Sequence, residues 1–234
     1  MKLQKETKGR DIHGRWYGDA CGTAFGLEIL GERWSLLVIR ELMFGPRRFS
    51  DLRASLPGIS AKVLTERLAT LEEAGVLVRR KLAPPAASRV YELTEWGYRA
   101  EPVIQEMGRW AVLSEGHDPT LPLSPASLMM SMRTMQKHGA MASAPDMCGR
   151  IVVGGDGFDV SVEGGTLHMA RADSDARAGD FTLRAEAAPP IAGLLYADIP
   201  IEAMVEQGAV TVEGDAAKLA LYLDLFALPP KITG

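Results

Sequence analysis

The sequence predicts an α+β protein of two domains, one mostly helical with a single β-hairpin and one in which strands and helices are mixed. Apolar residues in the first half recur at the three- and four-residue spacing of helices, whereas glycine-punctuated strand patterns dominate the second half. The segment between them, Ser114 to Pro125, holds three prolines and a glycine, a composition typical of a linker. We therefore expect domains over residues 1–113 and 125–234, joined by residues 114–124.

The two halves of the chain differ in charge. Residues 1–112 contain 18 Lys and Arg against 14 Asp and Glu, and residues 113–234 contain 8 against 16. A basic half beside an acidic half indicates that only the first half meets a polyanion. No run of eighteen apolar residues and no apolar stretch at the N-terminus is present, so we expect no membrane association and a cytoplasmic location.

Four helices are expected along the first half. They cover residues 20–30, 32–44, 50–56 and 61–74. Gly45-Pro46 stops the second helix, and Ser50 and Ser60 are expected to cap the third and the fourth. In the fourth helix, apolar residues at a helical period face inward. They are Leu64, Leu68 and Leu71.

A hairpin and a closing helix follow. Val76 to Leu82 and Arg89 to Leu93 read as two strands, flanking a proline-containing tip at Ala83 to Ser88. Thr94 can cap a last helix over residues 95–112. Helices followed by a hairpin and a closing helix are the parts of a winged helix-turn-helix, whose second helix enters the DNA major groove.

The helix after Ser60 is therefore the candidate recognition helix. Its outward face has small residues beside Lys62, Thr65 and Glu66, which can meet base edges. Further basic residues flank it where a winged helix meets phosphates or the minor groove. The candidate DNA-binding residues are Ser60, Lys62, Thr65, Glu66, Arg67, Arg47, Arg48, Arg80, Ser88 and Arg89. The alternative is a solvated helix with ordinary surface charges.

The string LEILGERWSLLVIRELMFGPRRFSDLRASLPGISAKVLTERLATLEEAGVLVRR, followed by RVYELTEWG, resembles the HxlR-type winged helix-turn-helix family along nearly the whole DNA-binding domain. The resemblance rests on Trp34, the GPRRFSDL segment, the PGIS turn and the LTERL…LEEAG helix. It implies a dimeric repressor or activator on an inverted-repeat operator in double-stranded DNA, and we expect a repressor. The first and last helices would form the homodimer interface, consistent with Trp96, Tyr98, Met107 and Trp110.

Cys21 sits where several members of this family carry a reactive cysteine. A thiol sensor needs a lowered pKa and access to solvent. No Lys or His adjoins Cys21 in the sequence, and the neighbouring Asp19 opposes a lowered pKa. We therefore expect a small packed core cysteine, with redox sensing as the alternative. Cys148 lies far from Cys21 in the sequence, so we expect no disulfide framework.

The second half mixes strands and helices. Ser124-Pro125 begins a helix, and Gly164-Gly165 between alternating runs predicts a tight hairpin. The expected strands cover residues 150–153, 158–163, 166–171, 180–185 and 209–213, and the expected later helices cover residues 190–196, 201–207 and 215–226.

The segment from Phe181 to Phe226 resembles the sterol carrier protein-like lipid-binding fold, through Thr182 and Leu183, the helix before Tyr196 and the run from Gly208 to Asp215. The resemblance implies a sheet with helices on one face, enclosing an apolar tunnel. We expect a small hydrophobic or aromatic effector there. The candidate pocket residues are Met129, Met132, Phe158, His168, Phe181, Leu195, Met204 and Phe226. A plain hydrophobic core is the alternative interpretation.

Catalysis is not expected. The four histidines are scattered without metal-ligand spacing, and no serine lies in a nucleophile elbow. We expect no cofactor and no metal, and a ligand-responsive transcriptional regulator. Two other classes stay open: a lipid- or acyl-binding carrier whose N-terminal domain serves dimerisation, and a protein-interaction module.

Overall fold

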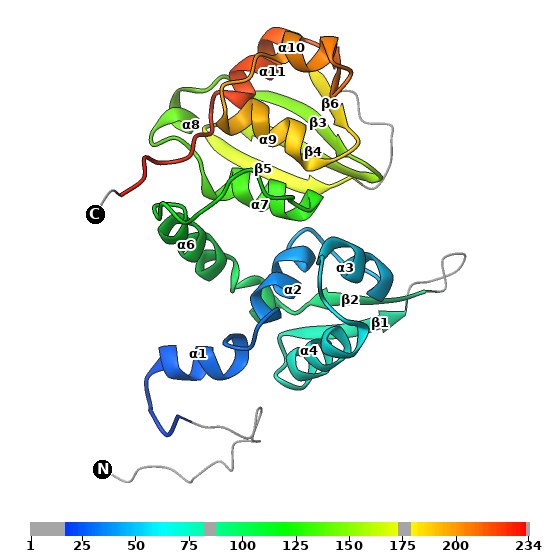
Figure 1. Ribbon diagram of the computed structural model, residues 1–234, viewed down its shortest axis with the longest axis vertical. Helices are drawn as coiled ribbons and strands as arrows, with labels where there is room; N and C mark the ends of the chain where they lie inside the picture. The colour runs from blue at the N-terminus through cyan, green and yellow to red at the C-terminus, as the bar shows by residue number, and fades with distance from the viewer. Residues whose placement is uncertain (1–16, 82–87, 173–178, 233–234) are drawn as a thin grey trace. The chain divides into compact units, whose positions relative to one another are not determined.

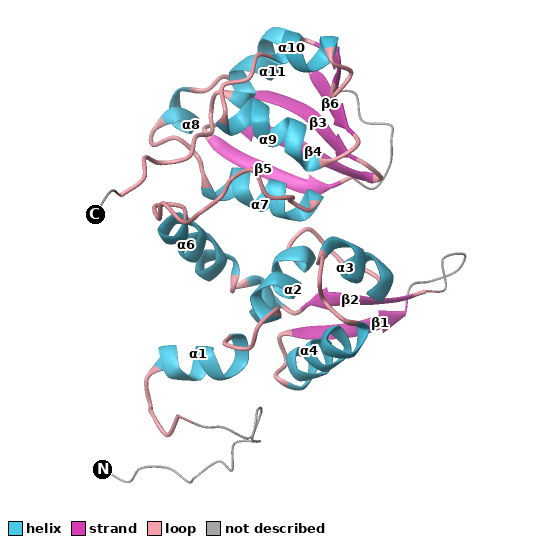
Figure 2. Cartoon of the chain, in the orientation of Figure 1, coloured by secondary structure: helices cyan, strands magenta, loops and turns pink. Residues whose placement is uncertain are grey.

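A computed structural model of the chain describes residues 17–81, 88–172 and 179–232. Contacts divide the chain into two compact units: residues 1–42 with 46–100 form the first, and residues 43–45 with 101–234 form the second. Helices and strands occur in both units (Figure 1 and Figure 2), which confirms the predicted α+β class. The expected domains, 1–113 and 125–234, stay a prediction, and the division in the structure falls earlier, after residue 100.

The first unit has the element order of a winged helix-turn-helix. Its elements are α1 (Gly22–Leu30), α2 (Ser35–Leu42), α3 (Phe49–Ser55), α4 (Ala61–Glu73), β1 (Leu77–Lys81), β2 (Arg89–Leu93) and α5 (Glu95–Tyr98). Leu64, Leu68 and Leu71 of α4 are buried, as expected. Burying such a side chain contributes about 1.5–3 kcal/mol, which explains why α4 turns this face inward.

Polar side chains satisfy free backbone amides at the starts of α3 and α4. The Ser60 hydroxyl accepts a hydrogen bond from the Val63 N–H at 3.2 Å, which confirms it as the cap of α4. The expectation that Ser50 caps α3 is wrong, because α3 begins at Phe49 and its N-cap is Arg48. Here the Asp51 carboxylate accepts from the Arg48 N–H at 3.2 Å, so an acidic side chain of the first turn satisfies the free amide.

The hairpin pairs β1 with β2 in antiparallel register, with Lys81 opposite Arg89. Arg47 extends this pairing, since it exchanges backbone hydrogen bonds with Tyr91 at 2.9 and 2.8 Å. Of the expected tip, residues 83–87 lie outside the described residues. The winged helix-turn-helix is thus present as predicted.

The closing helix is not continuous, contrary to the single helix expected over residues 95–112. α5 ends at Tyr98, and α6 (Glu101–Ala111) begins after a short break. Pro102 has no N–H to continue the α5 hydrogen-bond ladder to the Tyr98 carbonyl. Thr94 does cap α5, as its hydroxyl accepts from the Gly97 N–H at 3.0 Å.

The second unit contains a five-stranded sheet of order β5-β4-β3-β6-β7. β3 pairs in parallel with β6, and the other neighbours are antiparallel. The elements after α6 are α7 (Pro125–Thr134), α8 (Ala140–Ser143), β3 (Met147–Val153), β4 (Asp156–Glu163), β5 (Thr166–Arg171), β6 (Phe181–Ala185), α9 (Ala188–Tyr196), α10 (Ile201–Glu206), β7 (Thr211–Gly214) and α11 (Ala216–Leu223). The prediction for this half lacked α8.

One face of this sheet carries the core of the second unit. Alternate residues of the central strands, such as Ile151, Phe158 and Leu183, are fully buried, and α9 and α11 pack against the sheet (Figure 2). The opposite face carries polar side chains, because successive strand residues point to opposite sides. Gly164 and Gly165 have φ of 54° and 78°, which confirms the predicted tight hairpin between β4 and β5.

Candidate nucleic-acid interface

The exposed face of α4 is the centre of the candidate DNA interface. Lys62, Thr65 and Glu66 are exposed, and the small residues Ala61 and Ala69 lie exposed beside them. The three leucines of α4 are buried on its other side. A helix that presents small and hydrogen-bonding residues on one face can approach base edges in a major groove.

Contacts within α4 limit what its polar residues can offer. The Lys62 ammonium lies 3.9 Å from the Glu66 carboxylate, and the Lys62 side chain is 86% exposed. An exposed pair of this kind is worth at most about 1 kcal/mol, so Lys62 remains available to a base. The Thr65 hydroxyl donates to the Ala61 carbonyl at 2.9 Å, and it can still accept. The Ser60 hydroxyl is committed to its cap.

Arg67, expected as a phosphate contact, points elsewhere in the structure. Its guanidinium lies 3.2 Å from the Glu32 carboxylate, and its side chain is only 16% exposed. The Glu32 side chain is 51% exposed, so water screens this pair and opening it has only a modest cost. The DNA contact of Arg67 stays a prediction, and it requires this ion pair to open.

The wing carries exposed cations at its outer end. Lys81 and Arg89 are exposed and directly opposite one another in the register. Like charges placed directly across a ladder are destabilising on their own, and a phosphate backbone relieves that repulsion. Sequence reasoning left Lys81 out of the candidate set, because only the register shows which residue faces Arg89.

The other candidate residues of the wing and the turn differ in their contacts. Arg80 pairs with Glu92 at 2.8 Å and is 63% exposed. Ser88 is half-buried and Arg48 is exposed at the start of α3. Arg47 is half-buried, and its backbone is held against Tyr91. The first unit thus brings α4, the wing and the turn before α3 together in one fold, with basic residues on each.

Cys21 is exposed at the N-cap of α1, so the expected packed core cysteine is wrong. Hydrogen bonds from the Thr23 backbone, the Thr23 hydroxyl and the Ala24 backbone hold the pKa of the Cys21 thiol below its usual value. A thiolate is stabilised at a helix N-terminus, where unpaired amide groups point outward. The signal in the sequence was the N-cap position and not a neighbouring basic residue.

The expected apolar pocket residues divide into two groups. Seven lie in the core of the second unit and are at most 9% exposed. They are Met129, Met132, Phe158, Phe181, Leu195, Met204 and Phe226. Leu195 and Phe226 also line a surface pocket beside α9 and α11. Their role in ligand binding stays a prediction.

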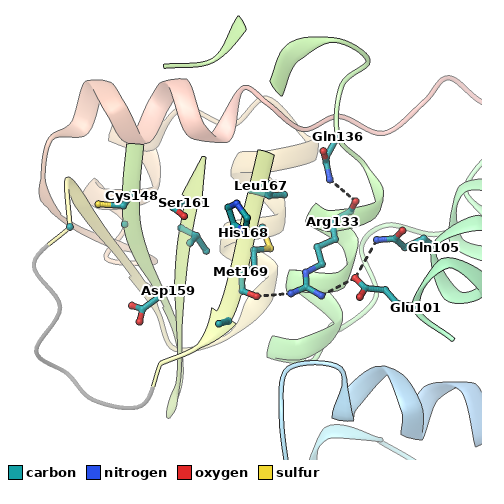
Figure 3. Close-up of a pocket in the computed structure, with 14 residues that line it drawn as sticks. Glu101, Gln105, Arg133, Gln136, Cys148, Asp159, Ser161, Leu167, His168 and Met169 are labelled. Carbon is teal, nitrogen blue, oxygen red and sulfur yellow. Dashed lines mark hydrogen bonds and ion pairs between the residues drawn. The ribbon is translucent and has the colours of Figure 1, made fainter. Parts of the chain in front are cut away.

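His168, the eighth, lines a separate polar pocket of about 500 Å³ in the second unit (Figure 3). Glu101 and Gln105 of α6 and Arg133 of α7 form the opposite wall. The Arg133 guanidinium donates to Glu101 at 2.8 Å and to the Met169 carbonyl at 2.5 Å. Sequence reasoning missed this pocket, because two helices, α6 and α7, and three strands, β3, β4 and β5, together form its walls.

Among the residues that the structure describes, no group of three or more His, Cys, Asp or Glu side chains is arranged to hold a metal ion. Within the same residues, no helix combines the length and the hydrophobicity that a bilayer span requires.

Known proteins match the segment that carries this interface. Residues 29–117 match the family model described as HxlR-like helix-turn-helix. The chain is 40% identical over 95 residues to the HTH-type transcriptional regulator YvaP of Bacillus subtilis (strain 168), covering 40% of this chain and 85% of YvaP. It is 43% identical over 89 residues to YodB of the same organism, covering 38% of this chain and 78% of YodB. A solved structure of reduced YodB is 37% identical, with a TM-score of 0.38, and covers 43% of this chain and 100% of that chain.

Proposed function

The chain belongs to the HxlR family of helix-turn-helix transcriptional regulators, and from this premise we propose that it represses transcription by binding an inverted-repeat operator as a homodimer. The relatives YvaP and YodB are described as transcriptional regulators. Most of their length aligns with about 40% of this chain, which is the part that holds the helix-turn-helix.

The observation that carries the proposal is the exposed face of α4. Lys62, Thr65 and Glu66 lie on a helix whose other face is buried leucine. Side chains that hold no structural position in the core are free to read bases, and Lys62 is suited to guanine. Lys81 and Arg89 of the wing supply phosphate contacts beside it.

Exposed apolar residues support the homodimer. α6 exposes Val103, Met107 and Trp110, at spacings of four and three residues, and Trp110 is 75% exposed. No residue of α6 is buried. In the first unit, Trp96 of α5 is also half-exposed. Large apolar side chains in a helical stripe mark a surface that another chain covers.

We propose that the second unit binds a small hydrophobic or aromatic effector. The five-stranded sheet with helices packed on its apolar face supports the likeness to the sterol carrier protein-like fold. The functional division follows the expected domains: residues 1–113 bind DNA and dimerise, and residues 125–234 respond to the effector. Truncation after Leu113 is expected to preserve operator binding and to abolish the effector response.

The test of the proposed function is a gel shift with the full chain and DNA from its own promoter region. We expect binding that competitor DNA of unrelated sequence does not displace and that weakens steeply with salt. Binding that is absent, or equal on all sequences, would falsify the regulator proposal and leave the carrier alternative.

A second signal is proposed for Cys21, because its thiol is exposed and its pKa is lowered. Oxidation of this thiol would add bulk or charge at the start of α1, one of the two helices proposed for the dimer. The YodB protein has been studied in a reduced form. Comparing operator binding before and after diamide treatment, in the wild type and in Cys21→Ser, tests this signal. Equal loss in both proteins would exclude Cys21.

A further inference from the structure

The polar pocket of the second unit points to a specific class of ligand. We infer that it binds a small planar heterocycle with adjacent N–H and C=O groups, such as a lactam, held by the backbone edge of β5. Calling this ligand the effector rests on the proposed function, whereas the binding itself does not depend on it.

The place of β5 in the sheet determines which of its backbone groups point outward. β5 lies at the edge of the sheet, and the Gly164-Gly165 turn closes on the pair Glu163 and Thr166. Residue pairs alternate between hydrogen-bonded and non-hydrogen-bonded along an antiparallel ladder. The pair that closes a two-residue turn is hydrogen-bonded, so Leu167 and Met169, one and three positions further along, lie in non-hydrogen-bonded pairs. Their N–H and C=O groups therefore point away from β4. The hydrogen bond from Arg133 to the Met169 carbonyl agrees with this direction.

The outward backbone groups of β5 differ in whether they have a hydrogen-bond partner. Arg133 occupies the Met169 carbonyl, as a neighbouring strand would. Among the described residues, neither the Leu167 carbonyl nor the Met169 N–H has a hydrogen-bond partner. These two groups are neighbours on the outward edge, one an acceptor and the other a donor. Their complement is a donor beside an acceptor in the plane of the sheet, which is the edge of a lactam.

The size and the charge of the pocket limit which ligand it can hold. A pocket of about 500 Å³ holds one ring with substituents. Its charges are balanced, because Arg133 pairs with Glu101 and Asp159 pairs with Arg150, each at 2.8 Å. A balanced lining gives no net attraction to a free ion, so it favours an uncharged ligand.

The pocket also adjoins α6. Glu101 and Gln105 of α6 face β5 across the pocket (Figure 3). A ligand seated on the β5 edge therefore contacts the helix that exposes Met107 and Trp110. A ligand that binds more tightly to one position of a helix than to another shifts the helix toward the first position. Occupancy of this pocket therefore regulates the apolar stripe of Val103, Met107 and Trp110 that is proposed for the homodimer.

The experiment uses 2-pyridone, a planar lactam, and saturation-transfer NMR on the full-length chain. N-methyl-2-pyridone is the matched control, because it keeps the ring and the carbonyl but lacks the N–H. A ligand this small is expected to bind in the millimolar range. The loss of one hydrogen bond to the Leu167 carbonyl is expected to weaken the control about tenfold.

Two substitutions test the backbone directly. Met169→Pro removes the outward N–H but no bond of the ladder to β4, a position where an edge strand accepts proline. It is expected to weaken 2-pyridone about tenfold. Leu167→Pro is the matched variant, because it keeps the Leu167 carbonyl and the Met169 N–H, and it should bind within about twofold of the wild type. If either variant fails to fold, the comparison of 2-pyridone with N-methyl-2-pyridone on the wild-type chain still tests the inference.

Equal binding of the two pyridones, no binding of 2-pyridone, or an unchanged affinity in a folded Met169→Pro would each overturn the inference. Preferential binding of the peptide acetyl-Thr-Val-Thr-amide, lost in Met169→Pro, would assign the edge to a protein strand instead and would also overturn it. The promoter gel shift on the same protein separates this outcome from a failure of the proposed function.

Discussion

At the scale of single residues, the polar side chains beside the exposed face of α4 differ in whether they are free to contact DNA. Ser60 and Arg67 are adjacent to this exposed face, but Ser60 caps α4 and Arg67 pairs with Glu32. Lys62 is left as the most exposed cation of that face, with only a weak contact to Glu66. Lys62 is therefore the first residue that we propose for reading a base.

Lys62→Ala is expected to weaken binding to the operator by about 1–3 kcal/mol relative to unrelated DNA, because one base contact is lost. Lys81→Ala is the matched control, since a phosphate contact carries no sequence information. It is expected to weaken binding to all sequences alike and to reduce the salt slope by about 1. Titrations of both variants at several salt concentrations measure this. If Lys62→Ala weakens binding to the operator and to unrelated DNA equally, Lys62 contacts a phosphate and not a base.

Cys21 is expected to react faster with iodoacetamide than the half-buried Cys148. The hydrogen bonds from Thr23 and Ala24 favour the thiolate. The midpoint of the rate-against-pH curve for Cys21 should therefore lie below that of an ordinary thiol, about 8.5. Mass spectrometry of the two cysteine-containing peptides gives both rates in one sample. A midpoint at or above the ordinary value contradicts the assignment.

At the scale of elements, hydrogen bonds between near neighbours explain which helices and turns were predicted correctly and which were not. The Gly164-Gly165 turn and the Thr94 cap follow from contacts within a few residues. The break between α5 and α6 also has a local cause, Pro102, but apolar periodicity runs through it and hides it. Periodicity reports which face is apolar and not whether the hydrogen-bond ladder continues.

Gly165→Val is expected to lower the thermal midpoint of the second unit. Its φ of 78° is unfavourable for a β-branched residue, and an added Cβ would lie 3.2 Å from the Ala142 Cα. Strain of this kind costs about 1–3 kcal/mol. Gly155→Ala is the matched control, because that glycine has no neighbouring atom within 4 Å of an added Cβ and no positive φ. Similar midpoints for the two variants would mean that the turn relaxes freely.

At the scale of the whole molecule, ion pairs join elements that the chain places far apart. The Lys218 ammonium of α11 lies 2.5 Å from the Asp180 carboxylate, which also accepts the Cys148 N–H of β3 at 2.9 Å. The hydrogen bond from Lys218 lowers the pKa of Asp180, and the same bond raises the pKa of Lys218. This cluster connects the first turn of α11 with the starts of β3 and β6.

Lys218→Met is expected to change how stability depends on pH. Because the pKa of Asp180 is lowered in the folded protein, this carboxylate stabilises the fold above pH 3.8, its ordinary pKa. That stabilisation is lost as the pH falls through the lowered pKa of the folded state. Because the pKa of Lys218 is raised in the folded protein, this ammonium stabilises the fold below pH 10.5, its ordinary pKa. That stabilisation is lost as the pH rises through the raised pKa of the folded state. The difference in thermal midpoint between wild type and variant should be greatest between these limits and vanish under strong acid. A difference that is constant with pH would assign the effect to lost packing.

The sequence by itself determined the winged helix-turn-helix, the buried leucines of α4, the caps at Ser60 and Thr94, and the hairpin at Gly164-Gly165. Each depends on a helical or strand period, or on hydrogen bonds between near neighbours, and these are written in short stretches of chain. Only the tertiary structure decided that Lys81 faces Arg89, that Arg67 turns to Glu32, and that β5 is an edge strand beside α6. These pairings depend on register and strand order, which contacts between distant segments fix.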